Sequence, residues 1–301
     1  MKKLTIVNPS DQDFWKMPES YLNMIRKEFA HWEIRELKKF ELELSLLKDA
    51  HAIIGLPFPA NLIRGNPHLE WVHFLTAQIP LSWQKMSKKY IISNTKVSRD
   101  SVAEHALYLA LKGIRKETFY HSRSWDKDNF GISKLASEST LGIIGFGNIG
   151  TKISELAQPL FKEIRFLTNR KDSPAHATLY SYDDKSFFKD LDVVIIATDH
   201  NEQTESFFND PGFYQNLNEE IIIVNISRGE LFIEKDLISF LTTNPKATYL
   251  ADVTSPEPYP EDGELLTLSN VYLSPHVGGR FESIWPKHEK ETLDIIKERN
   301  V

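Results

Sequence analysis

The sequence predicts an α/β fold with two doubly wound parallel-sheet domains. Short runs of β-branched and aromatic residues alternate with longer amphipathic segments, which is typical of strands alternating with helices. The later strand candidates are almost entirely Ile, Val and Leu, as expected where helices cover both faces of a parallel sheet. The chain has 301 residues, more than one hydrophobic core usually spans, so two domains are expected.

The first hundred residues hold one series of strands and helices. The strand candidates are Leu4–Val7, Ala52–Gly55, Trp71–Leu75 and Tyr90–Ser93. Helical patterns lie between them, at Tyr21–Phe29 and Phe40–Lys48. This alternation predicts the first parallel sheet.

The second series predicts a larger sheet. Its strand candidates are Leu141–Gly145, Ile164–Thr168, Val193–Ala197, Ile221–Asn225, Thr248–Ala251 and Val271–Leu273. A strong helical pattern, Ser101–Lys116, precedes this series, and a last helix is expected over about Phe281–Glu298. The segment Ser122–Ser139 is polar and irregular and is predicted to be a long loop.

The net charge and the lack of cysteine argue against several classes of protein. A net charge of -6 does not suit a nucleic-acid binder, and an anionic substrate would need a local cation. Without cysteine there is no disulfide, catalytic thiol or thiolate metal site, and no metal site is predicted. No apolar run approaches the roughly 18 residues of a membrane span, and Leu4–Val7 is too short for a signal segment. We therefore expect a cytoplasmic protein that binds no membrane.

A glycine-rich turn follows the first strand of the second series. Gly145, Gly147 and Gly150 have the spacing G-x-G-x-x-G, after an apolar strand and at the start of an amphipathic helix. The glycines allow a tight turn and close backbone approach, and the helix N-terminus offers amide groups to a pyrophosphate. This context predicts a Rossmann cofactor domain, and the alternative is a strand–helix turn that binds nothing.

The end of the next strand indicates which dinucleotide is bound. NAD enzymes usually place an acidic residue there to hold the ribose hydroxyls. The strand ends instead in Thr168, Asn169 and Arg170, and no carboxylate follows until Asp172. A hydroxyl, an amide and an arginine suit a 2′-phosphate, so NADP is the preferred cofactor and NAD is possible. The alternative is that Arg170 lies in a solvated basic turn.

Four polar residues come just after later strands of the same series. Arg228, Asp252 and His276 each follow an apolar run, and Glu257 lies between two prolines. Ligands of open α/β sheets bind at the carboxyl ends of the strands, so these side chains are expected to face one crevice. Each residue taken singly also fits a salt-bridge or surface role, but three such residues after strands of one sheet favour a site.

These residue types match the reduction of a 2-oxo acid. Nicotinamide supplies a hydride, and the forming alkoxide needs a proton. His276 is the predicted general acid, and Glu257 would orient its ring and favour the imidazolium. Arg228 would pair with the substrate carboxylate through its planar guanidinium and polarise the adjacent carbonyl.

The chain resembles the D-isomer-specific 2-hydroxyacid dehydrogenase family from roughly Ser98 to Arg280. The motifs that carry this resemblance are Ser101–His105, Thr140–Gly150, Asp192–Ile196, Asn225–Gly229, Asp252–Pro258 and Ser274–Gly279. Two segments, Phe166–Arg170 and Asp252–Pro258, look most like the glyoxylate/hydroxypyruvate reductase branch, which prefers NADPH.

The resemblance implies roles and domain boundaries. Arg228, Glu257 and His276 match the catalytic residues of the family, and Asp252 matches the residue that holds the nicotinamide carboxamide. The cofactor domain, residues 98–280, would be inserted into a smaller flavodoxin-like substrate domain, residues 1–97 plus 281–301, and two cofactor domains would pair in a homodimer.

The resemblance also implies which residues contact the ligands. The predicted cofactor contacts are Gly145, Phe146, Gly147, Asn148, Ile149, Gly150, Thr168, Asn169, Arg170, Thr198, Thr204, Ile226, Asp252 and Gly278. The predicted substrate contacts are Thr76, Ala77, Gln78 and Arg228. The loop Thr76–Pro80 lacks the glycine that relatives usually carry there, where backbone amides hold the substrate carboxylate.

The sequence therefore predicts a reductase of a small 2-oxo acid such as glyoxylate or hydroxypyruvate. One alternative is an NAD-dependent D-2-hydroxyacid or phosphoglycerate-type dehydrogenase, which the missing acid at Thr168 disfavours. Another is a dinucleotide-sensing scaffold resembling the C-terminal-binding-protein corepressors, which keep the same three catalytic residue types.

Overall fold

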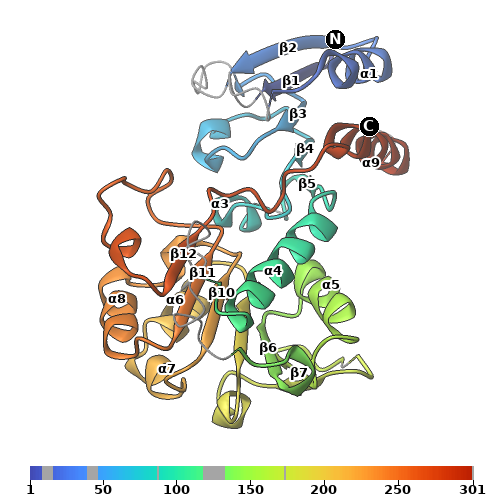
Figure 1. The fold of residues 1–301 in the computed structure, drawn as a ribbon. Coiled ribbons are helices and arrows are strands. Elements are labelled where there is room, and N and C mark those ends of the chain that lie inside the picture. Colours follow the sequence, from blue (N-terminus) through green and yellow to red (C-terminus); the bar gives the residue numbers. More distant parts are fainter. Residues whose placement is uncertain (9–15, 39–46, 87, 118–132, 173, 300–301) are drawn as a thin grey trace. The chain divides into compact units, whose positions relative to one another are not determined.

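A computed structural model describes residues 1–8, 16–38, 47–86, 88–117, 133–172 and 174–299 (Figure 1). The chain divides into two compact units. The first unit comprises Met1–Ser98 and Arg280–Val301, and the second comprises Arg99–Gly279. Each contains a parallel sheet, so the predicted α/β class with two parallel-sheet domains is confirmed.

The first unit contains a five-stranded parallel sheet in the order β2-β1-β3-β4-β5. This is the flavodoxin-like strand order. The strands are β1 (Lys3–Asn8), β2 (Glu33–Lys38), β3 (Ala52–Gly55), β4 (Trp71–Phe74) and β5 (Ile91–Asn94). The sequence did not predict β2, because four of its six residues are charged, as is common in an edge strand.

Two of the helices, α1 (Glu19–Glu28) and α9 (Ile284–Arg299), pack on this sheet through apolar residues on one face. The helix α1 buries Tyr21, Leu22 and Ile25, and Ile296 of α9 belongs to the same core. Short helices lie at η2 (Ala60–Ile63) and α3 (Leu81–Gln84). The predicted helix Phe40–Lys48 falls almost wholly outside the described residues.

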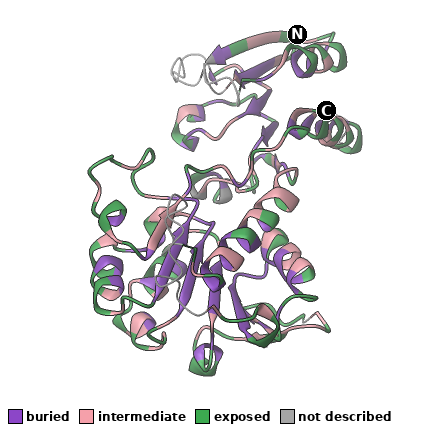
Figure 2. Ribbon diagram, in the orientation of Figure 1, coloured by how far each residue is buried: buried purple, intermediate pink, exposed green. Residues whose placement is uncertain are grey.

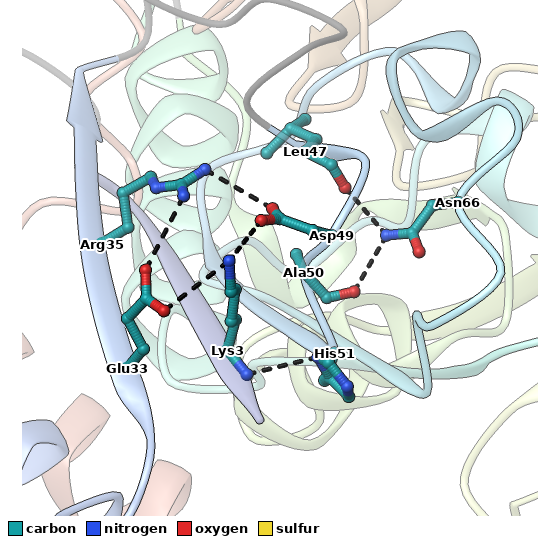
Figure 3. A network of polar contacts seen from close by, with 8 residues as sticks. All are labelled: Lys3, Glu33, Arg35, Leu47, Asp49, Ala50, His51 and Asn66. Carbon is teal, nitrogen blue, oxygen red and sulfur yellow. Dashed lines mark hydrogen bonds and ion pairs between the residues drawn. The ribbon is translucent and has the colours of Figure 1, made fainter. Parts of the chain in front are cut away.

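A network of ion pairs joins the amino ends of two strands to the segment before a third (Figure 3). Lys3 Nζ lies 2.6 Å from Asp49 and 3.6 Å from Glu33, and Arg35 lies 3.5 Å from Asp49. The hydrogen bond from Lys3 holds the pKa of Asp49 below its ordinary value. The backbone amide of Lys3 donates to His51. Two cations and two anions neutralise one another here, so the network positions strands and offers no net charge to a ligand.

Buried His288 makes the first unit sensitive to acid. It lies on α9 and is 3% exposed, and its Nδ1 has no hydrogen-bond partner in the described part of the chain. Burial lowers its pKa to about 4, whereas the unfolded chain should titrate near about 6.5. The stability linked to His288 is therefore complete above about pH 6.5 and declines as the pH falls towards 4, by about 3 kcal/mol in total, because only the unfolded chain binds the proton.

We expect His288→Leu to flatten this dependence. Urea unfolding of both proteins at about pH 7 and pH 5 measures it, with the wild type losing about 2 kcal/mol more than the variant. Tryptophan fluorescence suits this measurement because five of the six tryptophans lie in the first unit. Equal losses in the two proteins would show that His288 does not carry the effect.

The second unit contains a seven-stranded parallel sheet in the order β12-β11-β10-β9-β6-β7-β8. Counted from β6, this is the Rossmann order 3-2-1-4-5-6 with one further strand. The strands are β6 (Thr140–Ile144), β7 (Glu163–Leu167), β8 (Thr178–Tyr180), β9 (Val193–Ile196), β10 (Ile222–Asn225), β11 (Thr248–Ala251) and β12 (Val271–Leu273). Only the three-residue edge strand β8 was not predicted.

Two layers of helices cover this sheet (Figure 1). One layer contains α4 (Arg99–Ile114) and α5 (Asn148–Ala157), and the other contains α6 (Glu202–Phe208), α7 (Pro211–Gln215) and α8 (Glu234–Thr243). Alternate residues of each strand enter the two cores, and the inner strands β6, β9, β10 and β11 are buried along their whole length (Figure 2). Among the described residues, no helix combines the length and the apolar character that crossing a membrane requires.

Candidate active site

The predicted cofactor and catalytic residues gather at one edge of the seven-stranded sheet. All strands of this sheet are parallel, so their carboxyl ends meet there. Gly145 follows β6, Thr168 follows β7, Arg228 follows β10 and Asp252 follows β11. His276 comes three residues after β12.

The glycine-rich turn is shaped to admit a phosphate. Gly145 has a φ of 107°, and a Cβ there would lie 2.4 Å from the carbonyl oxygen of Ala197. A Cβ on Gly150 would lie 2.2 Å from the carbonyl oxygen of Gly145, so the strand and the helix touch through bare backbone. A Cβ on Gly147 would meet nothing within 4 Å, so that side of the turn is open.

The helix behind this turn supplies unused donors. Gly147 is the N-cap of α5, and no side chain caps the helix. The first amides of a helix have no intrahelical acceptor and carry the positive end of its dipole. An open turn with free amides fits the pyrophosphate of a dinucleotide.

The residues after β7 form a compact polar turn. Thr168 is 8% exposed, and its hydroxyl accepts a hydrogen bond from the Arg170 amide. The Arg170 guanidinium lies over the Phe146 ring, 4.9 Å from its centre, and donates to the Phe146 carbonyl oxygen. Asn169 donates to Gln203, near the start of α6. The structure thus brings the cofactor residues of β7 against the glycine-rich turn.

Three other predicted cofactor residues have structural partners. Thr204 is part of a capping box with Asn201 at the start of α6, and its hydroxyl donates to the carbonyl oxygen of Asp199. The carbonyl oxygen of Thr198 accepts a hydrogen bond from Ser227. Ile226 is 8% exposed and belongs to the core beneath α4. The Thr204 hydroxyl is therefore already hydrogen-bonded within the capping box at the start of α6.

His276 and Glu257 form the predicted pair. His276 Nδ1 lies 2.8 Å from Glu257 Oε2, and the other carboxylate oxygen accepts the amide of Thr254. Burial would raise the pKa of Glu257, but the hydrogen bond and charge of His276 outweigh it and hold that pKa below its ordinary value. An ionised Glu257 can only accept, so Nδ1 carries a hydrogen and Nε2 is left to exchange a proton with a ligand.

The backbone at His276 is unusual. Its φ is 51°, in the left-handed region that residues other than glycine and asparagine rarely adopt. Asp252, which is 3% exposed, accepts the amides of the next two residues, Val277 at 2.9 Å and Gly278 at 2.7 Å. A Cβ on Gly278 would lie 2.8 Å from Asp252 Oδ2, so this close approach needs glycine. Asp252 therefore fixes the turn that presents His276.

Sequence reasoning gave no role to two neighbours of Asp252. The Ser274 hydroxyl donates to Asp252 at 2.6 Å, and His105 Nε2 lies 3.3 Å from Asp252 and 3.1 Å from Ser274. Burial opposes ionisation of Asp252, yet its hydrogen bonds hold its pKa below the ordinary value. The only sequence signal for this contact was that both residues stand in the quoted motifs Ser101–His105 and Ser274–Gly279.

Arg228 is a partly buried cation without an ion pair among the described residues. Its Nη1 donates to the Ser227 carbonyl oxygen at 2.6 Å, and no carboxylate oxygen lies within 4 Å of the guanidinium. Burial lowers the pKa of Arg228, and the negative charges of Glu230, Glu257 and Asp199 oppose that change. The guanidinium stays charged and can bind a carboxylate in a bidentate manner.

Gly229 brings the arginine segment against the glutamate segment. A Cβ there would lie 2.1 Å from the backbone carbon of Thr254, so a side chain would push the two segments apart. The segment beyond Thr254 has cis peptide bonds before Pro256 and Pro258. Close backbone packing thus puts the loops of Arg228 and Glu257 side by side.

The predicted substrate contacts Thr76, Ala77 and Gln78 belong to the first unit, where they follow β4. The Thr76 hydroxyl donates to the Gln78 carbonyl oxygen, and Asn94 donates to the Ala77 carbonyl oxygen at 2.5 Å. These bonds order the loop. Within the described ranges, the acidic and histidine side chains form no cluster suited to a metal ion.

Comparison with known proteins identifies the family. Residues 103–278 match the family model of the D-isomer specific 2-hydroxyacid dehydrogenase NAD binding domain. The chain is 30% identical to glyoxylate/hydroxypyruvate reductase A of Arabidopsis thaliana, over 78% of this chain and 79% of that protein. It is 36% identical to human glyoxylate reductase/hydroxypyruvate reductase, but over only 47% of this chain and 44% of the human protein.

A solved structure gives the same result for the fold. The NADPH-dependent glyoxylate/hydroxypyruvate reductase of Sinorhizobium meliloti, solved with NADP and malonate, superposes with a TM-score of 0.78. The match has 19% identity and covers 98% of this chain and 92% of that chain. The predicted family is confirmed: the chain belongs to the D-isomer specific 2-hydroxyacid dehydrogenases, and its second unit contains their NAD-binding domain.

Proposed function

We propose that this protein reduces a small 2-oxo acid, such as glyoxylate or hydroxypyruvate, to the 2-hydroxy acid with NADPH. The observation that carries the proposal is the pairing of His276 with Glu257 at the sheet edge that also bears Arg228. Relatives named for glyoxylate and hydroxypyruvate reduction support this choice of substrates.

The reaction needs a hydride, a cation for the substrate carboxylate and a proton, and the chain has residues for the last two. The dinucleotide, when bound on the Gly145–Gly150 turn, supplies the hydride. Arg228 binds the substrate carboxylate, which orients the 2-oxo group, and its charge polarises the carbonyl. His276 Nε2 donates a proton to the oxygen as negative charge develops there, and Glu257 stabilises the imidazolium and keeps the remaining hydrogen on Nδ1 afterwards.

NADPH is the proposed cofactor and NADH a possible one. The support is that the turn after β7 offers Thr168 and Arg170 where NAD enzymes usually have a carboxylate. The assignment of residues 103–278 to an NAD-binding domain supports dinucleotide binding without distinguishing NADPH from NADH. The proposed assignment of residues 1–97 plus 281–301 to the substrate, with Thr76–Gln78 as contacts, rests on the resemblance.

Initial rates test the proposal. Purified protein is mixed with glyoxylate, hydroxypyruvate or pyruvate and either NADPH or NADH, and the loss of nicotinamide absorbance is followed. We expect rapid oxidation of NADPH with glyoxylate or hydroxypyruvate. A clear preference for NADH would favour the NAD-dependent dehydrogenase alternative. Tight dinucleotide binding without turnover would favour the scaffold alternative.

We also propose that the second unit pairs with its copy in a homodimer. An open hollow of about 480 Å³ on α4 and α5 is lined by mostly apolar surface, including Leu107, Leu111 and Leu156. Tyr108 beside them is 48% exposed, and an exposed aromatic side chain next to an apolar hollow suits a protein interface. Sedimentation velocity should give about twice the 34.8 kDa chain mass, and a monomer at every concentration would contradict the proposal.

The cytoplasmic location stays a prediction.

A further inference from the structure

The Arg170 guanidinium already has partners on three sides. The Phe146 ring lies against one face, and Nη1 donates to the Phe146 carbonyl oxygen at 2.9 Å. Asp172 binds the edge formed by Nε and Nη2, and its two carboxylate oxygens accept hydrogen bonds from Nε at 3.1 Å and from Nη2 at 2.7 Å. Asp172 thus occupies a complete bidentate edge of the guanidinium.

That edge is one of the two bidentate edges of the guanidinium that a phosphate can use, and the other lies beside the Asp172 carboxylate. The planar fork of arginine matches carboxylate and phosphate oxygens in the same bidentate manner. The contacts with Phe146 use the ring face and Nη1, so they can persist when another anion binds at Nε and Nη2. A ribose 2′-phosphate must therefore replace Asp172 or lie beside its negative charge.

A phosphate can displace the Asp172 carboxylate from this edge of Arg170 at little cost in free energy. The side chains of Arg170 and Asp172 are 54% and 68% exposed, so water can solvate Asp172 once it is released. Exposed ion pairs contribute little to stability, typically below about 1 kcal/mol. The cost of displacing Asp172 should be small but measurable as a loss of affinity.

We propose that Asp172 sets the preference between NADPH and NADH by competing with the ribose 2′-phosphate for Arg170. The inference rests on the proposed function, which makes the protein a dinucleotide binder. NADH carries no 2′-phosphate and does not compete for the guanidinium, so Asp172 opposes NADPH alone. The pairing leaves the chain able to use both dinucleotides, and loss of the Asp172 charge should move it towards NADPH.

The test is the dinucleotide affinity of the full-length Asp172→Asn variant, measured by isothermal titration calorimetry. We expect the Kd of NADPH to fall about two- to fivefold and that of NADH to stay unchanged. Adenosine 2′,5′-bisphosphate and adenosine 5′-phosphate isolate the ribose end and should reproduce the difference. Asp183→Asn is the matched control, because Asp183 is exposed and makes no hydrogen bond to Arg170 in the structure.

Two results would overturn the inference. One is an unchanged ratio of the NADPH and NADH affinities in Asp172→Asn. The other is a gain in NADPH affinity that Asp183→Asn reproduces, or that persists when Arg170 is also replaced by Ala, because the effect would then be one of bulk charge. If the wild type binds neither dinucleotide, the proposed function fails as well, and this result is distinct from an unchanged ratio.

Discussion

Replacing His276 with Asn should reduce kcat by about 10²–10⁴-fold while NADPH still binds. Asparagine is the informative substitution because the φ of 51° at this position suits it better than alanine. The turn held by Asp252 should therefore keep its shape while the imidazole is lost. The measurement combines steady-state rates with calorimetric titration of NADPH.

The affinity for NADPH separates loss of the proton donor from loss of the fold. We expect the Kd to change by less than about twofold, since the variant leaves the Gly145–Gly150 turn intact. His31→Asn is a suitable control, because His31 is exposed and lies in the other unit. Unchanged turnover in His276→Asn would remove His276 from the mechanism.

Replacing Arg228 with Ala should reduce kcat/KM for a 2-oxo acid by about 10²–10³-fold. Among the described residues the guanidinium has no carboxylate partner within 4 Å, so its charge is available to the substrate. Arg228→Lys should recover only part of the loss, because an ammonium cannot form the bidentate pair. Rates over a range of substrate concentrations measure both variants.

A substrate without the carboxylate is the control for this prediction. The methyl ester of pyruvate keeps the 2-oxo group but has no negative charge to bind Arg228. Arg228→Ala should therefore lose no more than about tenfold on the ester, which is the part due to carbonyl polarisation, against about 10²–10³-fold on the acid. An equal loss on the acid and on the ester would show that Arg228 does not bind the carboxylate.

Much of the fold was predictable because its strands are buried on both faces. Nearly uninterrupted Ile, Val and Leu runs located six of the seven strands of the second sheet, and the glycine spacing placed the cofactor turn after the first of them. The strand β2 was missed because an edge strand needs only one buried face and carries charges on the other.

The candidate site was predictable as residue types, together with the pairing of Glu257 and His276, but its other contacts were not. Arg228 and His276 were chosen for following strands and Glu257 for its place between two prolines, yet no spacing in the sequence shows which ring nitrogen of His276 Glu257 binds. The link between Asp172 and Arg170 was also invisible, although only one residue separates them, because bonding depends on the shape of the turn. The contact of His105 with Asp252 joins residues far apart in the chain and needed the fold.

Transfer of a labelled hydride tests the proposed reaction most directly. Hydroxypyruvate is incubated with the protein and NADPH that carries deuterium at either of the two C4 positions, and the glycerate is analysed by mass spectrometry and chiral chromatography. We predict D-glycerate with one deuterium at C2 from one of the two labelled cofactors. Glycerate without deuterium from both cofactors, or neither glycerate from hydroxypyruvate nor glycolate from glyoxylate, would contradict the proposed hydride transfer to a 2-oxo acid.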